Sequence, residues 1–140
     1  MIYVDTSALV PYYCPETLSD AAQRFLASQN ELAISDLVEI ELFSALAKKV
    51  RAGEVGRKDA QRVQAAFQVH LESGLYIRLP VERRHFAAAR EWLAALRPPL
   101  AALDALHLAV AAGQPCPIVT VDASLARAAR AVGVAARVLR

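Results

Sequence analysis

The chain has 140 residues, of which 56% are hydrophobic, so it is long enough to bury a core and is not a disordered polymer. It contains only two cysteines, Cys14 and Cys116, which excludes a disulfide scaffold and a four-cysteine zinc site. The net charge of +2 at pH 7 does not by itself indicate a partner. We expect a single domain over residues 1–140.

The sequence predicts neither an export signal nor a membrane span. Asp5 interrupts the first apolar run, and no basic stretch precedes it. The apolar run 100–121 contains Asp104, His107 and Pro115, whereas a bilayer span needs about 20 predominantly apolar residues. We therefore expect a soluble, cytoplasmic protein without a membrane partner.

Short apolar runs alternate with longer helical patterns along the chain. Strands are predicted at 2–4, 32–35, 75–79, 117–121 and 135–139. Helices are predicted at 8–13, 17–28, 36–51, 58–72, 81–96, 101–112 and 123–131. Thr6 and Ser7 offer a cap for the first helix, and Gly74 and Gly133 end two others. This alternation is typical of an α/β fold with a parallel sheet.

Two aspartates directly follow predicted strands, Asp5 after the first and Asp122 after the fourth. Ligand sites of open parallel sheets lie at the carboxyl ends of the strands, so both carboxylates are candidates for one site. Alternatively, each aspartate only caps the following helix. That alternative suits Asp122 well, because Ala123 and Ser124 come next.

Asp104 is the only charged residue between Arg97 and Asp122, in the helical stretch LAALDALHLAVAAG. A helix that is apolar on nearly every side is buried, and a buried carboxylate is costly unless it is protonated, paired or bound to a metal. We favour a role for Asp104 in a metal site. A buried pair with His107, one turn further on, is the alternative.

Two glutamates, Glu39 and Glu41, lie in the stretch SDLVEIELFSAL. Residues two apart on a helix point about 200° away from each other, so only one can face a given site. Glu41 shares its face with Ser44 and Lys48, and an ion pair with Lys48 is the alternative to a site role. We expect Glu39 on the solvated exterior.

Carboxylates that converge in one cleft stay ionised only beside a cation, and an all-oxygen ligand set favours Mg²⁺ or Mn²⁺. Such an ion activates water against a phosphodiester. The sequence contains no GxxxxGK[ST], GxSxG or GxGxxG motif. Metal-assisted phosphodiester hydrolysis is therefore the leading chemistry.

The basic residues favour a polyanionic substrate. Without Asp5, Glu41, Asp104 and Asp122 the chain carries 16 basic residues against 10 acidic ones, a surplus that suits phosphate contacts. The arginines form two loose groups, each of which is alternatively a solvated helix face: Arg83, Arg84, Arg90 and Arg97, and then Arg127, Arg130, Arg137 and Arg140.

Four motifs, in order and spacing, resemble PIN-domain ribonucleases, specifically the VapC toxins of bacterial type II toxin–antitoxin pairs. They are MIYVDTSALV, SDLVEIELFSALAKKVRAG, LDALHLAVA and IVTVDASLARAAR. The resemblance covers the whole chain. It implies a three-layer α/β/α fold whose parallel sheet of four to five strands has the order 3-2-1-4-5. That order makes the strands before Asp5 and Asp122 neighbours.

The resemblance also implies roles for individual residues. It implies that Ser7 positions a water or a phosphate, and that Thr120 braces the site. Glu16 is not expected to be a ligand. The implied ligands of Mg²⁺, or alternatively Mn²⁺, are Asp5, Glu41, Asp104 and Asp122.

The implied activity is that of a Mg²⁺-dependent endoribonuclease toxin that cleaves structured RNA, a tRNA or rRNA, and so inhibits translation. The implied partners are a second copy in a homodimer and a VapB-like antitoxin. We expect the antitoxin near Tyr12, Tyr13 and Phe43, with core packing of these residues as the alternative. The alternative function is a non-catalytic PIN-like module that binds RNA or protein, against which the four acids argue.

Overall fold

The computed structural model describes residues 1–140 and contains one five-stranded sheet. All strand pairs are parallel, and the order β3-β2-β1-β4-β5 confirms the expected topology. The inner strands β1, β2 and β4 are buried throughout, as apolar runs covered on both faces should be. The strands are β1 (Ile2–Val4), β2 (Leu32–Ser35), β3 (Tyr76–Leu79), β4 (Ile118–Thr120) and β5 (Ala136–Val138).

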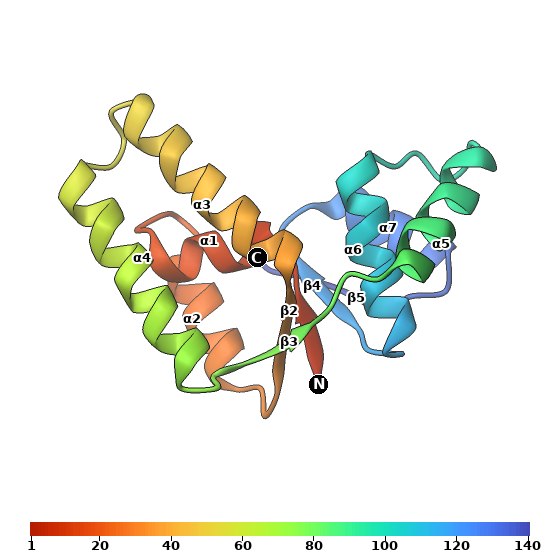
Figure 1. Cartoon of the computed structure of the whole chain (residues 1–140), viewed down its shortest axis with the longest axis horizontal. Coiled ribbons are helices and arrows are strands. Elements are labelled where there is room, and N and C mark those ends of the chain that lie inside the picture. The colour runs from red at the N-terminus through yellow and green to blue at the C-terminus, as the bar shows by residue number, and fades with distance from the viewer.

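Figure 1 shows helices α1 to α4 on one side of the sheet and α5 to α7 on the other, which gives the expected three layers. The chain winds outward from β1 in both directions, so right-handed crossovers place the two sets of helices on opposite faces. The helices are α1 (Thr6–Tyr13), α2 (Ser19–Ala27), α3 (Asp36–Arg51), α4 (Arg57–Glu72), α5 (Arg83–Ala94), α6 (Ala102–Gly113) and α7 (Ala123–Ala131).

Three helix starts differ from the prediction by two residues, and one of them is that of α2, which begins late, at Ser19. Helix α1 begins at Thr6, two residues early, because Asp5 takes the N-cap position while its side chain bonds elsewhere. Helix α5 begins two residues late, at Arg83, because Nδ1 of His85 accepts the N–H of Glu82 at 2.9 Å and fixes the start there. Helix α4 ends at Glu72 as predicted, and Gly74, two residues further on, adopts the left-handed backbone with φ of 75°.

The core joins both helical layers through the sheet. Its main cluster contains 26 buried residues, with Tyr3 and Phe67 the largest fully buried side chains. Residues 105–111 of α6 are all buried, and their small side chains let the helix pack closely against α5 and the sheet. None of the helices combines the length and hydropathy that crossing a bilayer requires.

Candidate active site

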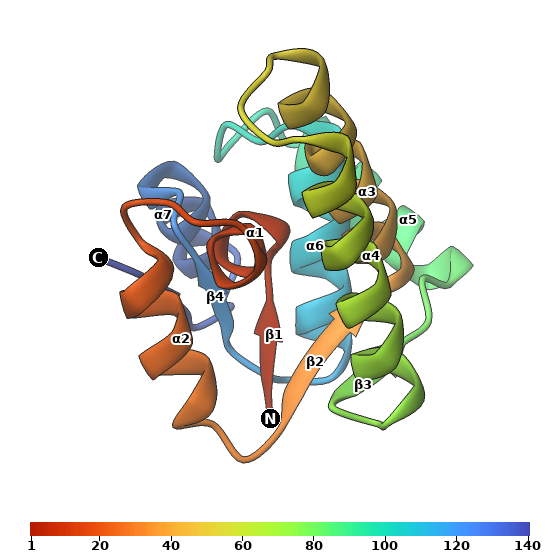
Figure 2. The same cartoon turned by 90° about the vertical axis from the view of Figure 1, so that its left-hand side faces the viewer.

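A cleft of about 450 Å³ opens at the carboxyl ends of β1 and β4. The strand order reverses between these strands, which is where open α/β sheets form ligand sites. Figure 2 shows β1 and β2 pointing the same way, toward the starts of α1 and α3. The structure brings all four predicted acids to this cleft, from the β1–α1 junction, α3, the first turn of α6 and the β4–α7 junction: Asp5, Glu41, Asp104 and Asp122.

Asp5 is buried and held through one of its two oxygens. The hydroxyls of Ser7 and Thr120 both donate to Oδ2, the latter at 2.8 Å. The Ser7 oxygen also accepts the N–H of Val121 at 3.1 Å, which ties α1 to the end of β4. Oδ1 has no hydrogen bond, and Nε2 of His107 lies 3.9 Å from it. The hydroxyls therefore fix the carboxylate and leave Oδ1 free.

Asp122 both caps a helix and lines the cleft. Its Oδ1 accepts the N–H groups of Ser124 at 2.8 Å and Leu125 at 3.3 Å, so the capping interpretation is correct. Its own N–H donates to the Thr120 hydroxyl at 3.0 Å. Because the cap uses Oδ1 alone, Oδ2 stays free.

Glu41 likewise bonds through a single oxygen. Oε1 accepts the Thr6 hydroxyl at 3.1 Å and a short hydrogen bond from Nε2 of His107. Burial acts to raise the pKa of Glu41, but the His107 and Thr6 contacts outweigh it and hold this pKa below its ordinary value. Ser44 and Lys48 line the cleft as predicted, and no ion pair joins Lys48 to Glu41.

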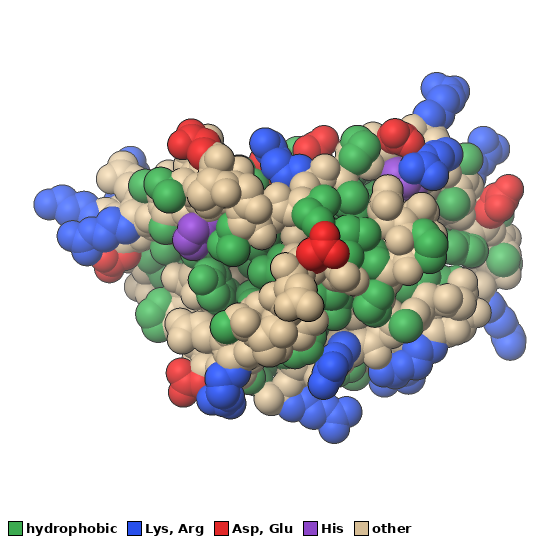
Figure 3. All heavy atoms as spheres, turned by 90° about the horizontal axis from the view of Figure 1, so that it is seen from below, with side chains coloured by type: hydrophobic (Ala, Val, Ile, Leu, Met, Phe, Trp, Pro, Cys, Tyr) green, Lys and Arg blue, Asp and Glu red, His purple; other side chains and the backbone are tan.

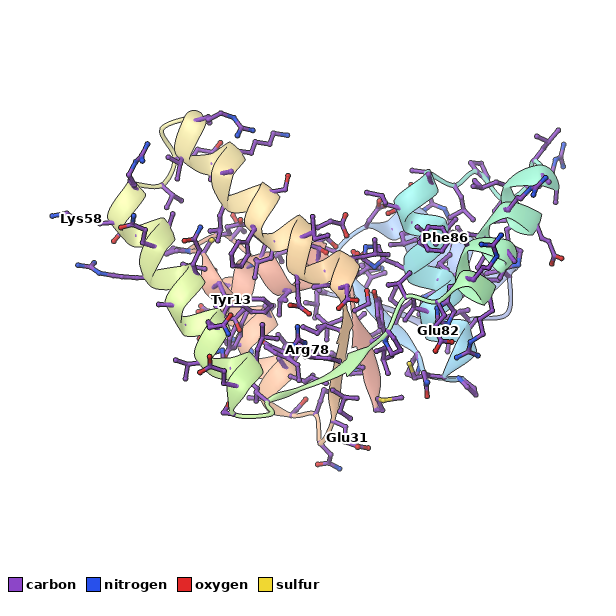
Figure 4. The ribbon with its side chains drawn as sticks, in the orientation of Figure 1. Tyr13, Glu31, Lys58, Arg78, Glu82 and Phe86 are labelled. Atoms are coloured by element: carbon purple, nitrogen blue, oxygen red, sulfur yellow. The ribbon has the colours of Figure 1, made fainter.

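Glu39 lies outside the cleft, as expected, but it is paired and less solvated than expected. Both of its oxygens bind Arg78 of β3, at 2.8 Å from Nη2 and 3.0 Å from Nε (Figure 4). The side chain of Glu39 is only 20% exposed. The sheet order places β3 next to the start of α3, and this neighbour supplies the arginine.

Asp104 is half-buried rather than enclosed, because it lies in the first turn of α6 at the mouth of the cleft. The expected alternative of a pair with His107 is wrong, since that ring bonds Tyr3 and Glu41. Burial raises the pKa of Asp104, and the nearby charge of Asp5 raises it further, with smaller contributions from Asp122 and Glu41. The four acids therefore repel one another across the cleft.

The donor set has the chemistry of a hard-cation site. Mg²⁺ and Mn²⁺ prefer carboxylate oxygens. Asp5, Glu41 and Asp122 line the same cleft as Asp104, and each has one carboxylate oxygen without a hydrogen bond. No three His, Cys, Asp or Glu side chains converge closely enough to hold an ion as they stand. The residues fit a divalent cation in type and location, and binding one requires the side chains to close inward.

A PIN domain family model matches residues 2–131. The protein belongs to the PIN domain family. This membership confirms the resemblance drawn from the four motifs. No curated protein sequence matches the chain significantly.

Solved structures share the whole fold of this PIN domain at low identity. VapC20 of Mycobacterium tuberculosis, a toxin that cleaves the sarcin–ricin loop, has a TM-score of 0.74 and 22% identity over 96% of each chain. FitAcB from Neisseria gonorrhoeae has a TM-score of 0.70 and 20% identity over 97% of this chain and 96% of its own. VapBC2 from Rickettsia felis, bound to a promoter DNA fragment, has a TM-score of 0.72 and 17% identity over 100% of both chains.

The sequence does not predict a contact with Glu41 for any of four residues around the PIN-domain cleft: Tyr3, Thr6, Ser35 and His107. Their side chains hold Glu41 directly or through His107. His107 was considered only as a partner of Asp104, its neighbour on the helix. Nothing in the local sequence indicates that Tyr3, an apolar strand residue by pattern, carries its hydroxyl to a histidine 104 positions away.

Of the three residues expected near an antitoxin, Tyr13 has its side chain held by hydrogen bonds, whereas Phe43 and Tyr12 border surface hollows. The Tyr13 hydroxyl lies 2.6 Å from both Nδ1 of His70 and the hydroxyl of Tyr76, so this side chain is pinned between α1, α4 and β3 (Figure 4). Burial raises the pKa of Tyr13. Phe43 is 42% exposed and borders an apolar groove with Ile40, while Tyr12 borders a separate hollow beside His70.

The two arginine groups also differ. In the second group, Arg130 donates to the carbonyl of Ala136 at 2.9 Å and Arg137 stacks on Phe25 at 5.2 Å, so both brace β5. In the first group, Arg83 and Arg90 flank the exposed Phe86 on α5. Figure 3 views the end where the strands begin, and there Lys and Arg side chains project around the edge of a face whose hydrophobic patches are interrupted by an acidic side chain.

Proposed function

We propose that this PIN domain is a metal-dependent endoribonuclease and the toxin of a toxin–antitoxin pair. One observation carries the proposal: four acids from four separate elements line a single cleft at the switch point of the sheet. Burial and the charges of the neighbouring acids raise the pKa of Asp104, and a bound cation would remove this cost of holding the carboxylates ionised together. A module that only binds RNA or protein gains nothing from such a cluster.

In this proposal the four acids Asp5, Glu41, Asp104 and Asp122 hold Mg²⁺, with Mn²⁺ as the alternative. Such an ion, when bound, polarises a phosphoryl oxygen and lowers the pKa of a water molecule so that it attacks as hydroxide. The protein supplies orientation. Each of Asp5, Glu41 and Asp122 has one oxygen fixed by the chain and one left free toward the cation.

Other residues of the cleft complete the site. Ser7 and Thr120 hold Asp5 in place, and we propose that Ser7, the more accessible of the two, also positions a water or a phosphate oxygen. Lys48 is the basic side chain that borders the cleft, so it is suited to a phosphate next to the scissile bond. We propose that stabilisation of the leaving oxygen falls to the bound cation rather than to a protein acid.

The substrate and partners are proposed from the fold relatives. VapC20 cleaves the sarcin–ricin loop, and VapBC2 and FitAB were solved with DNA fragments. By this likeness we propose structured RNA, a tRNA or an rRNA, as the substrate, with loss of translation as the result. We further propose a homodimer, a VapB-like antitoxin that covers the cleft, and a cytoplasmic location.

The test is cleavage of total tRNA and rRNA by purified, antitoxin-free protein in Mg²⁺, in Mn²⁺ and in EDTA. Asp5→Asn is the control for contaminating nucleases, because it removes one charge and keeps the side-chain shape. Discrete cuts that need metal and are absent with Asp5→Asn support the proposal. Folded wild-type protein that makes no cut with either metal, yet still binds RNA, would favour the non-catalytic binding module instead.

A further inference from the structure

A buried chain of polar side chains runs from the middle of the sheet to the cleft. The hydroxyls of Ser35 on β2 and Tyr3 on β1 lie 2.7 Å apart. The Tyr3 hydroxyl lies 2.6 Å from Nδ1 of His107 on α6, and Nε2 of the same ring bonds Oε1 of Glu41 on α3. Ser35, Tyr3 and His107 are all 0% exposed. Four elements thus meet in one connected line that ends at a cleft acid.

The Glu41 carboxylate at the end of this chain determines which group donates in each of its hydrogen bonds. An ionised carboxylate only accepts, so Nε2–H of His107 donates to Glu41. In the neutral ring Nδ1 then accepts, and the Tyr3 hydroxyl donates to it. The Ser35 hydroxyl in turn donates to the Tyr3 oxygen. Every donor has an acceptor, so the ring is held at both nitrogens and cannot rotate without breaking two buried hydrogen bonds.

We infer that His107 is a positioning residue that holds the Glu41 carboxylate in the cleft, with Oε1 hydrogen-bonded to the protein and Oε2 without a hydrogen bond. Glu41 otherwise depends on a single 3.1 Å hydrogen bond from Thr6, and a glutamate has three side-chain torsions to fix. The consequence for metal binding rests on the proposed function. The placement of the Glu41 side chain by His107 is independent of that function.

A second buried histidine provides the contrast. His85 is 4% exposed and packs on the far end of α6, where Gly113 leaves room for its ring. Its Nε2 has no partner, so being buried against α6 does not by itself give a histidine two partners. The His107 ring is bonded on both sides, and one of its partners borders the cleft.

Two amide variants separate positioning from packing. His107→Gln carries an amide nitrogen near the place of Nε2 and keeps the donor for Glu41. His107→Asn carries its amide near the place of Nδ1, so it still meets Tyr3 and loses Glu41. We expect His107→Asn to weaken Mn²⁺ binding to the EDTA-stripped protein by about 10–100-fold, and His107→Gln to bind close to wild type. Tyr3→Phe, which frees Nδ1 without opening a cavity, should fall between them.

The control is His85→Asn, which makes the same substitution in the other buried histidine of this layer. It should lower Tm and leave the Mn²⁺ dissociation constant unchanged, because His85 does not reach the cleft. Equal Mn²⁺ affinity in wild type and His107→Asn would overturn the inference. So would an equal loss in His85→Asn, which would trace the effect to general destabilisation.

Crystal structures of the metal-free proteins keep this test separate from the proposed function. We expect the Glu41 carboxylate to leave the cleft in His107→Asn and to stay in His107→Gln. An unmoved Glu41 in His107→Asn would overturn the inference even if the wild type cleaves RNA. A wild type that neither binds Mn²⁺ nor cleaves RNA would defeat the proposed function, and the position of Glu41 in these crystals would still decide the inference.

Discussion

Thr120 and Asp5 are 115 positions apart, and the Thr120 hydroxyl donates to Oδ2 of Asp5 at 2.8 Å. The same hydroxyl accepts the N–H of Asp122 at 3.0 Å. One side chain at the end of β4 therefore connects two of the four cleft acids. Its place follows from the parallel pairing of β1 with β4, which brings Val4 opposite Val119 and the next residues of both strands together.

Replacing Thr120 by Val tests this connection, because Val keeps the shape and removes the hydroxyl. The variant leaves a buried oxygen of Asp5 with one donor fewer and the N–H of Asp122 unpaired. An unsatisfied buried polar group costs about 1–3 kcal/mol, and we expect a loss of this size in the urea unfolding free energy. Thr120→Ser restores the hydroxyl and should recover most of the lost unfolding free energy. A Val variant as stable as wild type would contradict a stabilising role of the Thr120 hydroxyl between Asp5 and Asp122.

Glu39 and Glu41 make a matched pair for testing which face of α3 serves the cleft. Glu39→Gln breaks only its ion pair with Arg78, whose side chain is 52% exposed, and such pairs contribute about 0.2–1 kcal/mol. Its RNA cleavage rate should therefore stay within about twofold of wild type. Glu41→Gln removes a proposed ligand, and its rate should fall at least about tenfold. An equal loss in Glu39→Gln would contradict the assignment of the Glu41 face alone to the cleft.

The sequence alone was sufficient for the sheet and for the two strand-end acids. The apolar runs before Asp5 and Asp122 mark strands, and the ends of parallel strands share one edge whatever the side chains around them. Helix periodicity also separated Glu41 from Glu39, because Ser44 and Lys48 recur on the same face as Glu41. These features depend on short-range pattern and on general rules of topology.

Hydrogen bonds and ion pairs between side chains far apart in the sequence could not be predicted in the same way. The bonds of His107 to Tyr3 and Glu41 depend on how α6, β1 and α3 come together, and no local pattern encodes that geometry. The same holds for Arg78, whose pairing with Glu39 follows from β3 lying beside β2. Asp104 was expected to be enclosed because its helix is apolar, but a first-turn residue at the mouth of a cleft stays half-buried.

The metal-free protein should gain stability from Asp104→Asn at pH 7. Burial and the charge of Asp5 raise the pKa of the folded Asp104 carboxyl above its ordinary value of 3.8. Its stabilising contribution is thus fully present below about pH 3.8 and is lost as pH rises through the folded value. In EDTA at pH 7 we expect the Asn variant to melt a few degrees above wild type, with no advantage below pH 3.8.

Added Mg²⁺ is the control for that result. A ligand at 100 times its dissociation constant stabilises a folded protein by about 2.7 kcal/mol, so the wild type should gain more than Asp104→Asn and overtake it. Thermal melts of both proteins with and without Mg²⁺ measure the two effects. A variant that is less stable than wild type in EDTA at pH 7 would contradict the repulsion among the four acids.

His85 should make the protein sensitive to mild acid. Burial lowers the pKa of this histidine below its ordinary value of 6.5, and the neighbouring charge of Arg84 lowers it further. The unfolded chain therefore binds the proton first, so the contribution of His85 to stability is present above about pH 6.5 and is lost as pH falls through the lower folded value. Protonation also removes the Nδ1 acceptor that holds the N–H of Glu82 at the start of α5.

His85→Asn isolates this effect, because the variant retains all the other titratable groups of the chain. Although less stable than wild type at pH 7.5, it should lose less of its urea unfolding free energy between about pH 7.5 and pH 5. The difference between the two slopes belongs to His85, since every other titratable group is common to the two proteins. Parallel stability curves for the two proteins across this range would mean that folding does not depress the pKa of His85.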